Sequence, residues 1–364
     1  MLLYICIAIA LFGIIFMSCY KKETVDGNVI INQRLFYANN KIVKRMSFVM
    51  MAFLCFLTAF RSENIGNDTV TYVHFFDVIA EEGIVDWLDF EIGYQYLCLI
   101  FSKIANDAHL FLIFCAVFCY SVIGSQIKKR SENIGFSVCL FFSTLFSAYT
   151  SMLRQGIAMV IVLVAYFAIK EKRNFKAVIL ILLASLFHTS ALLAFLLFFH
   201  KYIPRKPQTM LPIIIVLVML SISGLLTDVL KWLIPFYEDF FDETRVADGW
   251  LAMTYYLFRS IVFYFFAYFA YKDDIDNKSL EMSAFSLLMV VSSLGFVVNI
   301  FSRVIDYFIL LLVIELPNAI CYSKIKNKTI WMVLICLVCI AYFFVATVLR
   351  PDWNHIFPYE FWKN

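Results

Sequence analysis

The chain has 364 residues, of which 63% are hydrophobic, 18% aromatic and 16% charged, and its formal net charge is +3. Soluble domains carry about 45–50% apolar and about 25% charged residues, so this composition excludes a cytosolic enzyme, a secreted disulfide scaffold and a nucleic-acid binder. Apolar runs recur along the whole length, which also excludes a single-span receptor. The sequence therefore predicts an all-α polytopic integral membrane protein.

The apolar runs predict the helices, because about 20 apolar residues are needed to cross about 30 Å of hydrocarbon. In chain order they cover residues 2–20, 46–60, 92–105, 108–125, 134–150, 155–169, 177–188, 189–201, 210–227, 251–271, 282–300, 305–321 and 329–349. They form one transmembrane domain over residues 1–364, with about twelve transmembrane helices.

Two stretches are too short or too interrupted for ordinary spans. Asn106 and Asp107 divide the apolar run 92–125, so we predict a re-entrant or interfacial half-helix over 92–105. Residues 177–201 form two short apolar pieces, which predict a broken hairpin around His188. With these half-helices the crossings bring all short basic loops to one side of the membrane.

The basic loops set the predicted orientation, since lysine and arginine accumulate in cytoplasmic loops. The clusters lie in residues 21–45, 128–130, 170–176, 201–206 and 324–328. All of them are cytoplasmic if the N-terminus is outside. The opposite loops, 61–91 and 228–250, are acidic and are predicted to be the two large outer loops.

The ten cysteines lie in or at the edges of apolar runs, which favours a packing role. No histidines accompany them at the spacing of a metal site. We therefore expect neither a metal ion nor a cofactor.

Ionisable residues within or at the outer ends of spans are the functional candidates, because such groups are costly in lipid. They are Arg61, Arg154, Arg259, Arg303 and His188. Guanidinium groups bind phosphate bidentately, so a cluster of arginines in the outer half of a helical bundle fits a lipid-linked pyrophosphate. The alternative is that Arg154 and Arg303 extend to the interface, or pair with Glu91 and Asp306.

Three residues other than the arginines are candidates for a functional role. His188 lies between two apolar segments and would transfer a proton or bind phosphate, unless a backbone carbonyl satisfies it. Asp68 and Glu91 each adjoin a turn glycine in the outer loop 61–91. Aromatic residues of the same loop, Tyr72 among them, suit a membrane interface or a sugar face.

Several of these residues form patterns that resemble the EpsG family of bacterial polysaccharide-biosynthesis membrane proteins. The early patterns are Arg61, Gly66-Asn67-Asp68-Thr69 with Tyr72, and Glu91-Ile92-Gly93-Tyr94. The central ones are Ser151-Met152-Leu153-Arg154-Gln155-Gly156 and Phe187-His188-Thr189-Ser190. The late ones are Arg303 with Tyr307 and Pro358-Tyr359-Glu360-Phe361-Trp362, so the resemblance spans residues 61–362.

The resemblance implies a metal-independent Wzy-type polymerase in the bacterial cytoplasmic (inner) membrane. Such an enzyme joins undecaprenyl-pyrophosphate-linked oligosaccharide repeats into O-antigen, capsule or exopolysaccharide on the outer, periplasmic face. Its partners would be that lipid-linked substrate, the membrane lipid, and a flippase and chain-length regulator, with no nucleic acid.

The resemblance also assigns residues to roles. His188, Asp68 and Glu91 become the catalytic candidates, and the candidates for binding substrate or pyrophosphate are Arg61, Arg154, Gln155, Arg259, Arg303, Tyr307, Tyr72 and Tyr94.

Two other functions stay open at this stage. An O-antigen ligase would use the same arginines on the same lipid but a different acceptor. A flippase of lipid-linked oligosaccharide, or another transporter, would place charged residues along a path through both leaflets, often with internal repeat symmetry. Here the ionisable residues gather in the outer leaflet, with Glu315 as the main inner exception, and no repeat is visible, which favours the polymerase.

Overall fold

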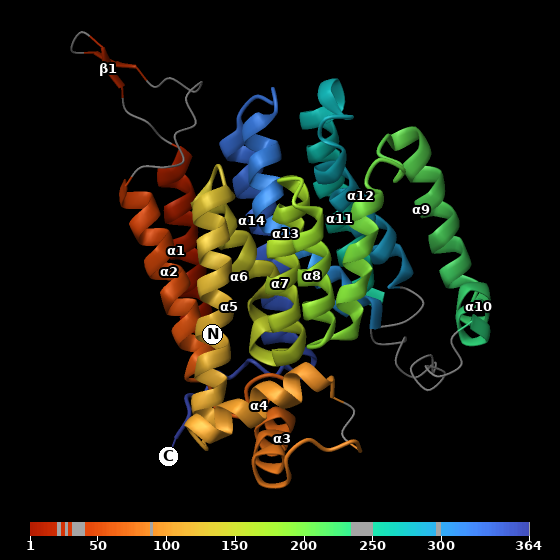
Figure 1. Cartoon of the computed structure of the whole chain (residues 1–364). Coiled ribbons are helices and arrows are strands. Elements are labelled where there is room, and N and C mark those ends of the chain that lie inside the picture. Colours follow the sequence, from red (N-terminus) through yellow and green to blue (C-terminus); the bar gives the residue numbers. More distant parts are fainter. Residues whose placement is uncertain are drawn as a thin grey trace. The chain divides into compact units, whose positions relative to one another are not determined.

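The computed structural model describes residues 1–19, 23–25, 28–30, 41–87, 90–233, 250–295 and 300–363. The regular structure of these residues is helical apart from an isolated β-bridge and one antiparallel pair of short strands, β1 (Glu23–Val25) and β2 (Asn28–Ile30) (Figure 1). The helices, in chain order, are α1 (Leu2–Cys19), α2 (Lys41–Ala59), α3 (Thr69–Glu82), α4 (Ile92–Ile104), α5 (Ala108–Arg130), α6 (Ile134–Ser151), α7 (Leu153–Lys170), α8 (Asn174–Ser185), η1 (Thr189–Phe199), α9 (Pro207–Ile222), α10 (Leu225–Leu233), α11 (Trp250–Tyr271), η4 (Lys272–Asp274), α12 (Ser279–Leu294), α13 (Ile300–Tyr322), α14 (Lys328–Phe344), η5 (Val345–Leu349) and η6 (Pro351–Trp353).

Seven helices in the described ranges are long and apolar enough to cross a membrane. They cover Lys41–Ala59, Ala108–Arg130, Ile134–Ser151, Leu153–Lys170, Trp250–Asp274, Arg303–Tyr322 and Lys328–Leu349. Shorter apolar helices cover Leu2–Met17, Asn174–Ser185, Thr189–Phe199, Pro207–Ile222 and Ser279–Leu294. The chain is thus an α-helical, multi-pass membrane protein, as predicted, while the number of about twelve transmembrane helices stays a prediction. Residues 234–249 of the predicted second outer loop, and 296–299 of a predicted span, lie outside the described residues.

The chain divides into two compact units. The first unit is Met1–Leu193 together with Lys326–Asn364, and the second unit is Ala194–Ile325. The second unit is built around α12, which packs against α9, α11 and α13. Each unit is described by itself below.

The core of the first unit consists of α6 and α7, which are apolar on all sides and therefore buried on nearly all sides. α6 packs against α1, α2 and α14, and α7 packs against α5 and α8. Phe141, Phe142 and Phe146 of α6 are fully buried in this core. The two helices are separated by Met152 alone, so the turn between α6 and α7 is tight and lies at one end of the unit.

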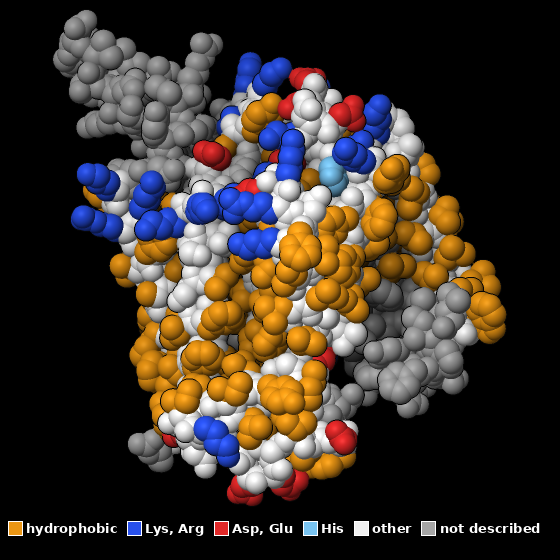
Figure 2. Space-filling view, in the orientation of Figure 1, with side chains coloured by type: hydrophobic (Ala, Val, Ile, Leu, Met, Phe, Trp, Pro, Cys, Tyr) orange, Lys and Arg blue, Asp and Glu red, His pale blue; other side chains and the backbone are white. Residues whose placement is uncertain are grey.

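The two ends of the first unit differ in charge. Lys41, Lys44 and Arg45 begin α2, and three basic residues end α5. In Figure 2 basic side chains gather at this end, and hydrophobic side chains cover the surface below it. At the opposite end, α3 and α4 lie across the ends of the bundle helices (Figure 1). This separation of basic residues agrees with the predicted sidedness of the loops, although the orientation itself stays a prediction.

The predicted loop 61–91 contains a helix, α3, and is therefore not an irregular loop. Tyr72, Phe76 and Ile79 of α3 are buried at helical spacing, and the Phe76 ring stacks on Phe111 of α5 at 5.0 Å. α3 also packs against α4. This part of the chain is thus a helical cap on the end of the unit.

The predicted break near His188 is present. α8 ends at Ser185, and the 3-10 helix η1 begins at Thr189, so His188 lies in the turn between them. A second predicted feature, the half-helix over 92–105, corresponds to α4, which has 13 residues. At that length α4 covers only about 20 Å, too little for the hydrocarbon core.

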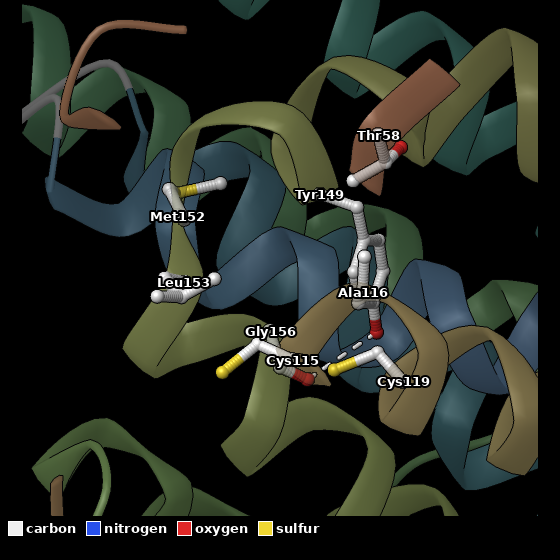
Figure 3. Close-up of a pocket in the computed structure, with 8 residues that line it drawn as sticks. All are labelled: Thr58, Cys115, Ala116, Cys119, Tyr149, Met152, Leu153 and Gly156. Atoms are coloured by element: carbon white, nitrogen blue, oxygen red, sulfur yellow. Dashed lines mark hydrogen bonds between the residues drawn. The ribbon is translucent and has the colours of Figure 1, made fainter. Parts of the chain in front are cut away.

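The described cysteines are free thiols and most of them are buried, which agrees with a packing role. Cys115 and Cys119 line a small cavity between α2, α5, α6 and α7, of about 10 Å³, which is room for about one water molecule (Figure 3). The Tyr149 hydroxyl points toward Gly156 and donates a hydrogen bond of 3.5 Å to its carbonyl. A Cβ at position 156 would lie 3.2 Å from the Tyr149 ring, so glycine permits this close packing of α6 on α7.

Candidate functional site

Four segments of the resemblance meet at the capped end of the first unit. They are the loop 61–69, residues 90–94 at the start of α4, the α6–α7 turn at 150–154, and residues 186–189 between α8 and η1. These segments lie far apart in the sequence, and the fold brings them together because α3 and α4 cover the ends of α5–α8 (Figure 1).

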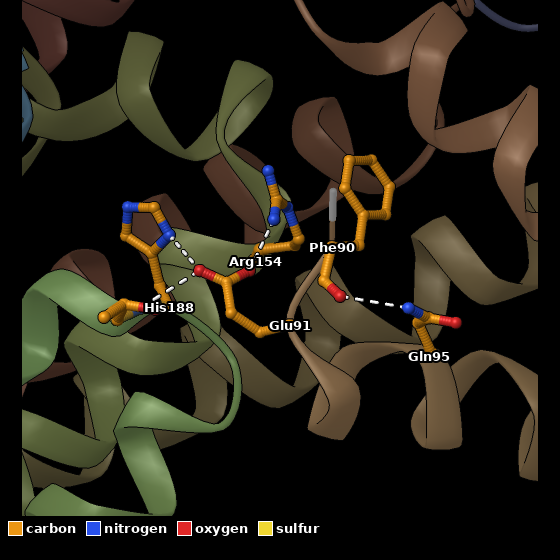
Figure 4. A network of polar contacts seen from close by, with 6 residues as sticks. Phe90, Glu91, Gln95, Arg154 and His188 are labelled. Carbon is orange, nitrogen blue, oxygen red and sulfur yellow. Dashed lines mark hydrogen bonds and ion pairs between the residues drawn. The ribbon is translucent and has the colours of Figure 1, made fainter. Parts of the chain in front are cut away.

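Glu91 is at the centre of the polar contacts in this region (Figure 4). Its Oε1 atom lies 2.9 Å from Nδ1 of His188 and accepts a hydrogen bond of 3.0 Å from the backbone N–H of Thr189. Its Oε2 atom forms an ion pair with the Arg154 guanidinium. One carboxylate therefore connects α4, α7 and the turn after α8.

The backbone explains why Glu91 reaches all three partners. Glu91 is extended and precedes the first residue of α4, so its side chain lies outside that helix. The backbone N–H of Gly93 donates a hydrogen bond of 2.9 Å to the carbonyl of Leu186. A Cβ on residue 93 would lie 2.7 Å from both the Leu186 carbonyl oxygen and its Cβ, so only glycine allows the two segments to approach this closely.

The electrostatics favour an ionised Glu91. Burial raises the pKa of this carboxyl, but the hydrogen bond with His188 and the charge of Arg154 outweigh it and lower the pKa to about 2. Arg154 in turn lies over the Phe90 ring, with 3.9 Å between the guanidinium carbon and the ring centroid. The Tyr72 side chain also interacts with Arg154 and lies beside the Phe90 ring, so two neighbouring aromatic side chains contact this cation.

The loop 61–69 is fixed against the α6–α7 turn by backbone contacts. Gly66 has φ +89°, and a Cβ there would lie 2.3 Å from the Thr150 carbonyl oxygen. The backbone N–H of Asn67 donates to Ser151 Oγ at 3.2 Å, and the Thr69 hydroxyl donates to the Thr150 carbonyl at 3.1 Å. The Gly-Asn-Asp-Thr pattern therefore positions the start of α3 beside the start of α7.

Arg61 is a buried part of this scaffold, with 1% of its surface exposed. Its guanidinium donates to the Thr58 carbonyl and, at 3.4 Å, to the Thr69 hydroxyl, and its backbone forms a β-bridge with Phe361. Burial lowers the pKa of Arg61 to about 10. Asp68, by contrast, is partly exposed at the start of α3.

A second group of charged residues lies in the second unit. Arg259 of α11 is 4% exposed and lies over the rings of Tyr255 and Tyr256, at 5.2 and 5.1 Å from their centroids. Asp306 of α13 interacts electrostatically with both Arg259 and Arg303. Arg303 is exposed near the start of α13, whereas its predicted companion Tyr307 is buried.

The structure thus brings the candidates together in two groups. Arg154, Glu91, His188 and Tyr72 share the site in the first unit. Arg259 and Arg303 share Asp306 in the second unit. Among the remaining candidates, Gln155 and Tyr94 are buried in α7 and α4. The predicted cluster of the four arginines in the outer half of the helical bundle, and the role of each candidate residue, stay predictions.

Ion pairing, which the sequence left open as the alternative for Arg154 and Arg303, occurs at Arg154 in the described structure, and Arg303 has an electrostatic interaction with the expected partner. Arg154 pairs with Glu91, and Arg303 interacts with Asp306. A paired arginine can still bind phosphate, because its planar group has five N–H donors and one carboxylate occupies only part of them.

Two residues of the site were missed by the sequence reasoning. Phe90 stacks on Arg154, and Gln95 donates a hydrogen bond of 3.0 Å to the Phe90 carbonyl while accepting one of 3.0 Å from the Val85 N–H (Figure 4). A glutamine inside the apolar segment 92–105 was a usable signal, because buried amides must be hydrogen-bonded. Phe90 had no such signal among 40 phenylalanines.

No group of three histidine, cysteine or acidic side chains that could hold a metal ion occurs within the described residues. Metal independence stays a prediction.

The comparison with protein families identifies the chain. A family model described as the EpsG family matches residues 44–361, which include every motif discussed above except for Trp362, the last residue of the late pattern. The chain belongs to the EpsG family. This is a family of Wzy-type polysaccharide polymerases, so membership supports a multi-pass membrane protein of polysaccharide biosynthesis with glycosyltransferase-like polymerase activity. Neither a curated protein nor a solved structure was found to match.

Proposed function

We propose that this EpsG-family protein joins oligosaccharide repeat units carried on undecaprenyl pyrophosphate. In the proposed reaction an acceptor sugar hydroxyl attacks the anomeric carbon of the donor chain. A C–O bond to the acceptor forms, the C–O bond to the donor's pyrophosphate breaks, and undecaprenyl pyrophosphate leaves. The observation that carries the proposal is the contact of Glu91 with both Arg154 and His188 at the capped end of the first unit.

His188 is the proposed general base. Ionised Glu91 accepts a hydrogen bond, so the His188 nitrogen that faces it, Nδ1, carries the proton. The Nε2 nitrogen then has the free lone pair that takes the proton of the acceptor hydroxyl. A carboxylate that orients a histidine in this way also stabilises the imidazolium formed during the reaction.

Glu91 is a positioning residue in this scheme. Its lowered pKa and its three partners make it a poor proton acceptor at neutral pH. Asp68, partly exposed at the start of α3, is the second candidate for the base.

Arg154 is proposed to stabilise the departing pyrophosphate. Charge develops on the phosphate oxygens as the sugar–oxygen bond breaks, and a positioned guanidinium stabilises that charge without the need for a metal. Phe90 lies against the Arg154 guanidinium and the Tyr72 side chain interacts with it, so these two aromatic residues help to position the cation.

The arginines of the second unit are proposed to bind the second lipid-linked substrate. Polymerisation requires a donor and an acceptor at the same time, and both carry a pyrophosphate. Arg259 and Arg303 both interact with Asp306. Among the described residues, they are the second group of arginines on segments that are predicted to face the outside. Tyr307 adjoins this group on α13.

The proposed setting is the bacterial inner membrane, crossed about twelve times, with the site facing the periplasm. The basic ends of α2 and α5 then lie in the cytoplasm, as lysine-rich and arginine-rich segments do. α4 lies in the outer interface, and a flippase and a chain-length regulator are the expected protein partners.

The test uses purified protein in nanodiscs with one defined undecaprenyl-pyrophosphate-linked repeat unit as the only sugar lipid. A polymerase converts it into a ladder of products that differ by one repeat. A ligase gives no product until a second acceptor lipid is added, and then makes a single transfer to that lipid without a ladder. A flippase moves the substrate between leaflets without extending it. Either of those results would overturn the proposal.

A further inference from the structure

An apolar groove lies on the first unit between α4, α5, α7 and α8. Its volume is about 380 Å³, which falls in the usual range of small-molecule sites of about 300–1,000 Å³. Its floor includes the buried residues Cys115, Ile157 and Val160, whereas Phe118 and Leu183 at its rim are exposed. The groove is therefore open on the surface that faces lipid.

The lining of the groove carries no hydrogen-bonding function apart from the thiol of Cys115. This apolar lining matches the hydrocarbon part of a ligand. It excludes a sugar or a peptide as the ligand, because the polar groups of either would be buried without hydrogen-bond partners.

One end of the groove adjoins the polar site. Ile157 follows Arg154 by three residues on α7, so both lie on the same face of that helix. Phe187, also in the groove, directly precedes His188. A ligand that fills the groove therefore ends within about one helical turn of the arginine and the histidine.

We propose that the groove binds the first isoprene units of the polyprenyl chain whose pyrophosphate lies at Arg154. The inference rests on the proposed function and names the part of the substrate that the site holds inside the membrane. In a polyprenyl pyrophosphate the hydrocarbon begins directly at the phosphate, which matches a groove that begins directly at a cation. A phospholipid instead places a glycerol and two ester groups between its phosphate and its two chains, and the groove has no donors for them.

Packing provides the selectivity of such a groove. Lipid tails already surround the protein, so an apolar chain gains nothing from leaving water, and only a close fit distinguishes one chain from another. The aromatic side chains of Phe114, Phe118 and Phe187 line the groove and offer flat surfaces against which a branched chain can pack.

The direct test is photo-crosslinking with a diazirine-bearing polyprenyl pyrophosphate that carries no sugar, so that labelling reports binding and not activity. Labelled peptides from α5, α7 or α8 in the wild-type protein are the expected result. A phospholipid with a diazirine in its acyl chain is the comparison probe. Equal labelling of the groove by both probes, or labelling elsewhere by the polyprenyl probe, would overturn the inference.

A matched pair of variants on α5 tests the groove by occlusion. Val122 lines the groove, whereas Val117 lies on the exposed surface of the same helix and does not. Val122→Trp should reduce both polyprenyl labelling and chain extension at least about tenfold, and Val117→Trp should change neither. Unfolding temperatures of the two variants serve as the folding control, and labelling of the unmodified protein decides the inference if Val122→Trp does not fold.

The outcomes separate this inference from the proposed function. Wild-type protein that extends chains but is not labelled in the groove overturns the inference and leaves the polymerase standing. Protein that is labelled in the groove but makes no ladder overturns the polymerase and leaves a polyprenyl-binding groove with another function. If Val122→Trp is labelled as strongly as the wild type, the inference about the groove is overturned and the proposed function is unaffected.

Discussion

Replacing Glu91 with glutamine tests the centre of the site most simply. The substitution preserves the size of the side chain and removes its charge. Arg154 loses its ion pair and His188 loses a charge-assisted hydrogen bond, whereas the backbone around Gly93 is unaffected. We expect Glu91→Gln to lower both the stability of the first unit and its activity.

The magnitude follows from the pKa of Glu91. A fall from 4.5 to about 2 corresponds to about 3 kcal/mol, at 1.36 kcal/mol per pKa unit, and the Glu91 side chain is 17% exposed, so solvent screening reduces this only in part. A carboxyl with a lowered pKa in the folded state stabilises the protein above its unfolded pKa. Its contribution is therefore complete above about pH 5 and is lost as the pH falls from 4.5 toward 2.

Thermal unfolding of the detergent-solubilised protein between pH 3 and pH 8 is the assay. At neutral pH we expect Glu91→Gln to unfold about 6–12 °C below the wild type, since about 2–4 °C accompanies each kcal/mol in a unit of this size. This difference should shrink as the pH falls from 4.5 toward 3. The control is Glu82→Gln, which removes the same charge from an exposed position at the end of α3.

Equal unfolding temperatures for the Glu91 and Glu82 variants at pH 7 would refute the reasoning. So would a difference between Glu91→Gln and the wild type that grows as the pH is lowered, since the sign of the linkage would then be opposite to that expected from a lowered carboxyl pKa.

Two further predictions concern neighbouring residues. Gly93→Ala should destabilise the protein by about 1–3 kcal/mol, because the added Cβ overlaps Leu186. The control is Gly124→Ala on α5, where a Cβ meets nothing within 4 Å, and this variant should be neutral or slightly stabilising. Equal melting temperatures of the two variants would show that the close approach at position 93 is unimportant. His188→Ala should lower the rate of chain extension about 10²–10⁴-fold with unchanged abundance in the membrane, the usual contribution of a general base, and Asp68→Asn should lower it less. Full activity of His188→Ala, together with a large loss in Asp68→Asn, would make Asp68 the base.

The class of the fold was accessible from the sequence, because it depends on average composition and on long apolar runs. The break at His188 was also predictable, since two apolar pieces flank it and neither is long enough to span a membrane. The helix α3 was not predicted, although its buried residues 72, 76 and 79 have helical spacing. Long-window hydropathy does not detect an amphipathic helix, which must be found by its periodicity.

The sequence allowed some of the residues that form the site to be predicted. Arg154 and His188 were selected as ionisable groups that are costly in lipid, and Glu91 as a carboxylate beside a turn glycine, with pairing of Arg154 and Glu91 left open as an alternative. The contact of Glu91 with His188 required the three-dimensional arrangement of α4 and the turn after α8. The sequence could not show that Arg61 is enclosed by the chain, because buried and exposed arginines have the same sequence signature.

The most direct test of the central claim, that arginines in both units bind polyprenyl pyrophosphate for polymerisation, is chain extension from one defined lipid-linked repeat by Arg154→Ala and Arg303→Ala. The account predicts membrane insertion of both variants and, with equal amounts of folded protein in the assay, no product longer than the starting repeat. A ladder of wild-type length from either variant would contradict it.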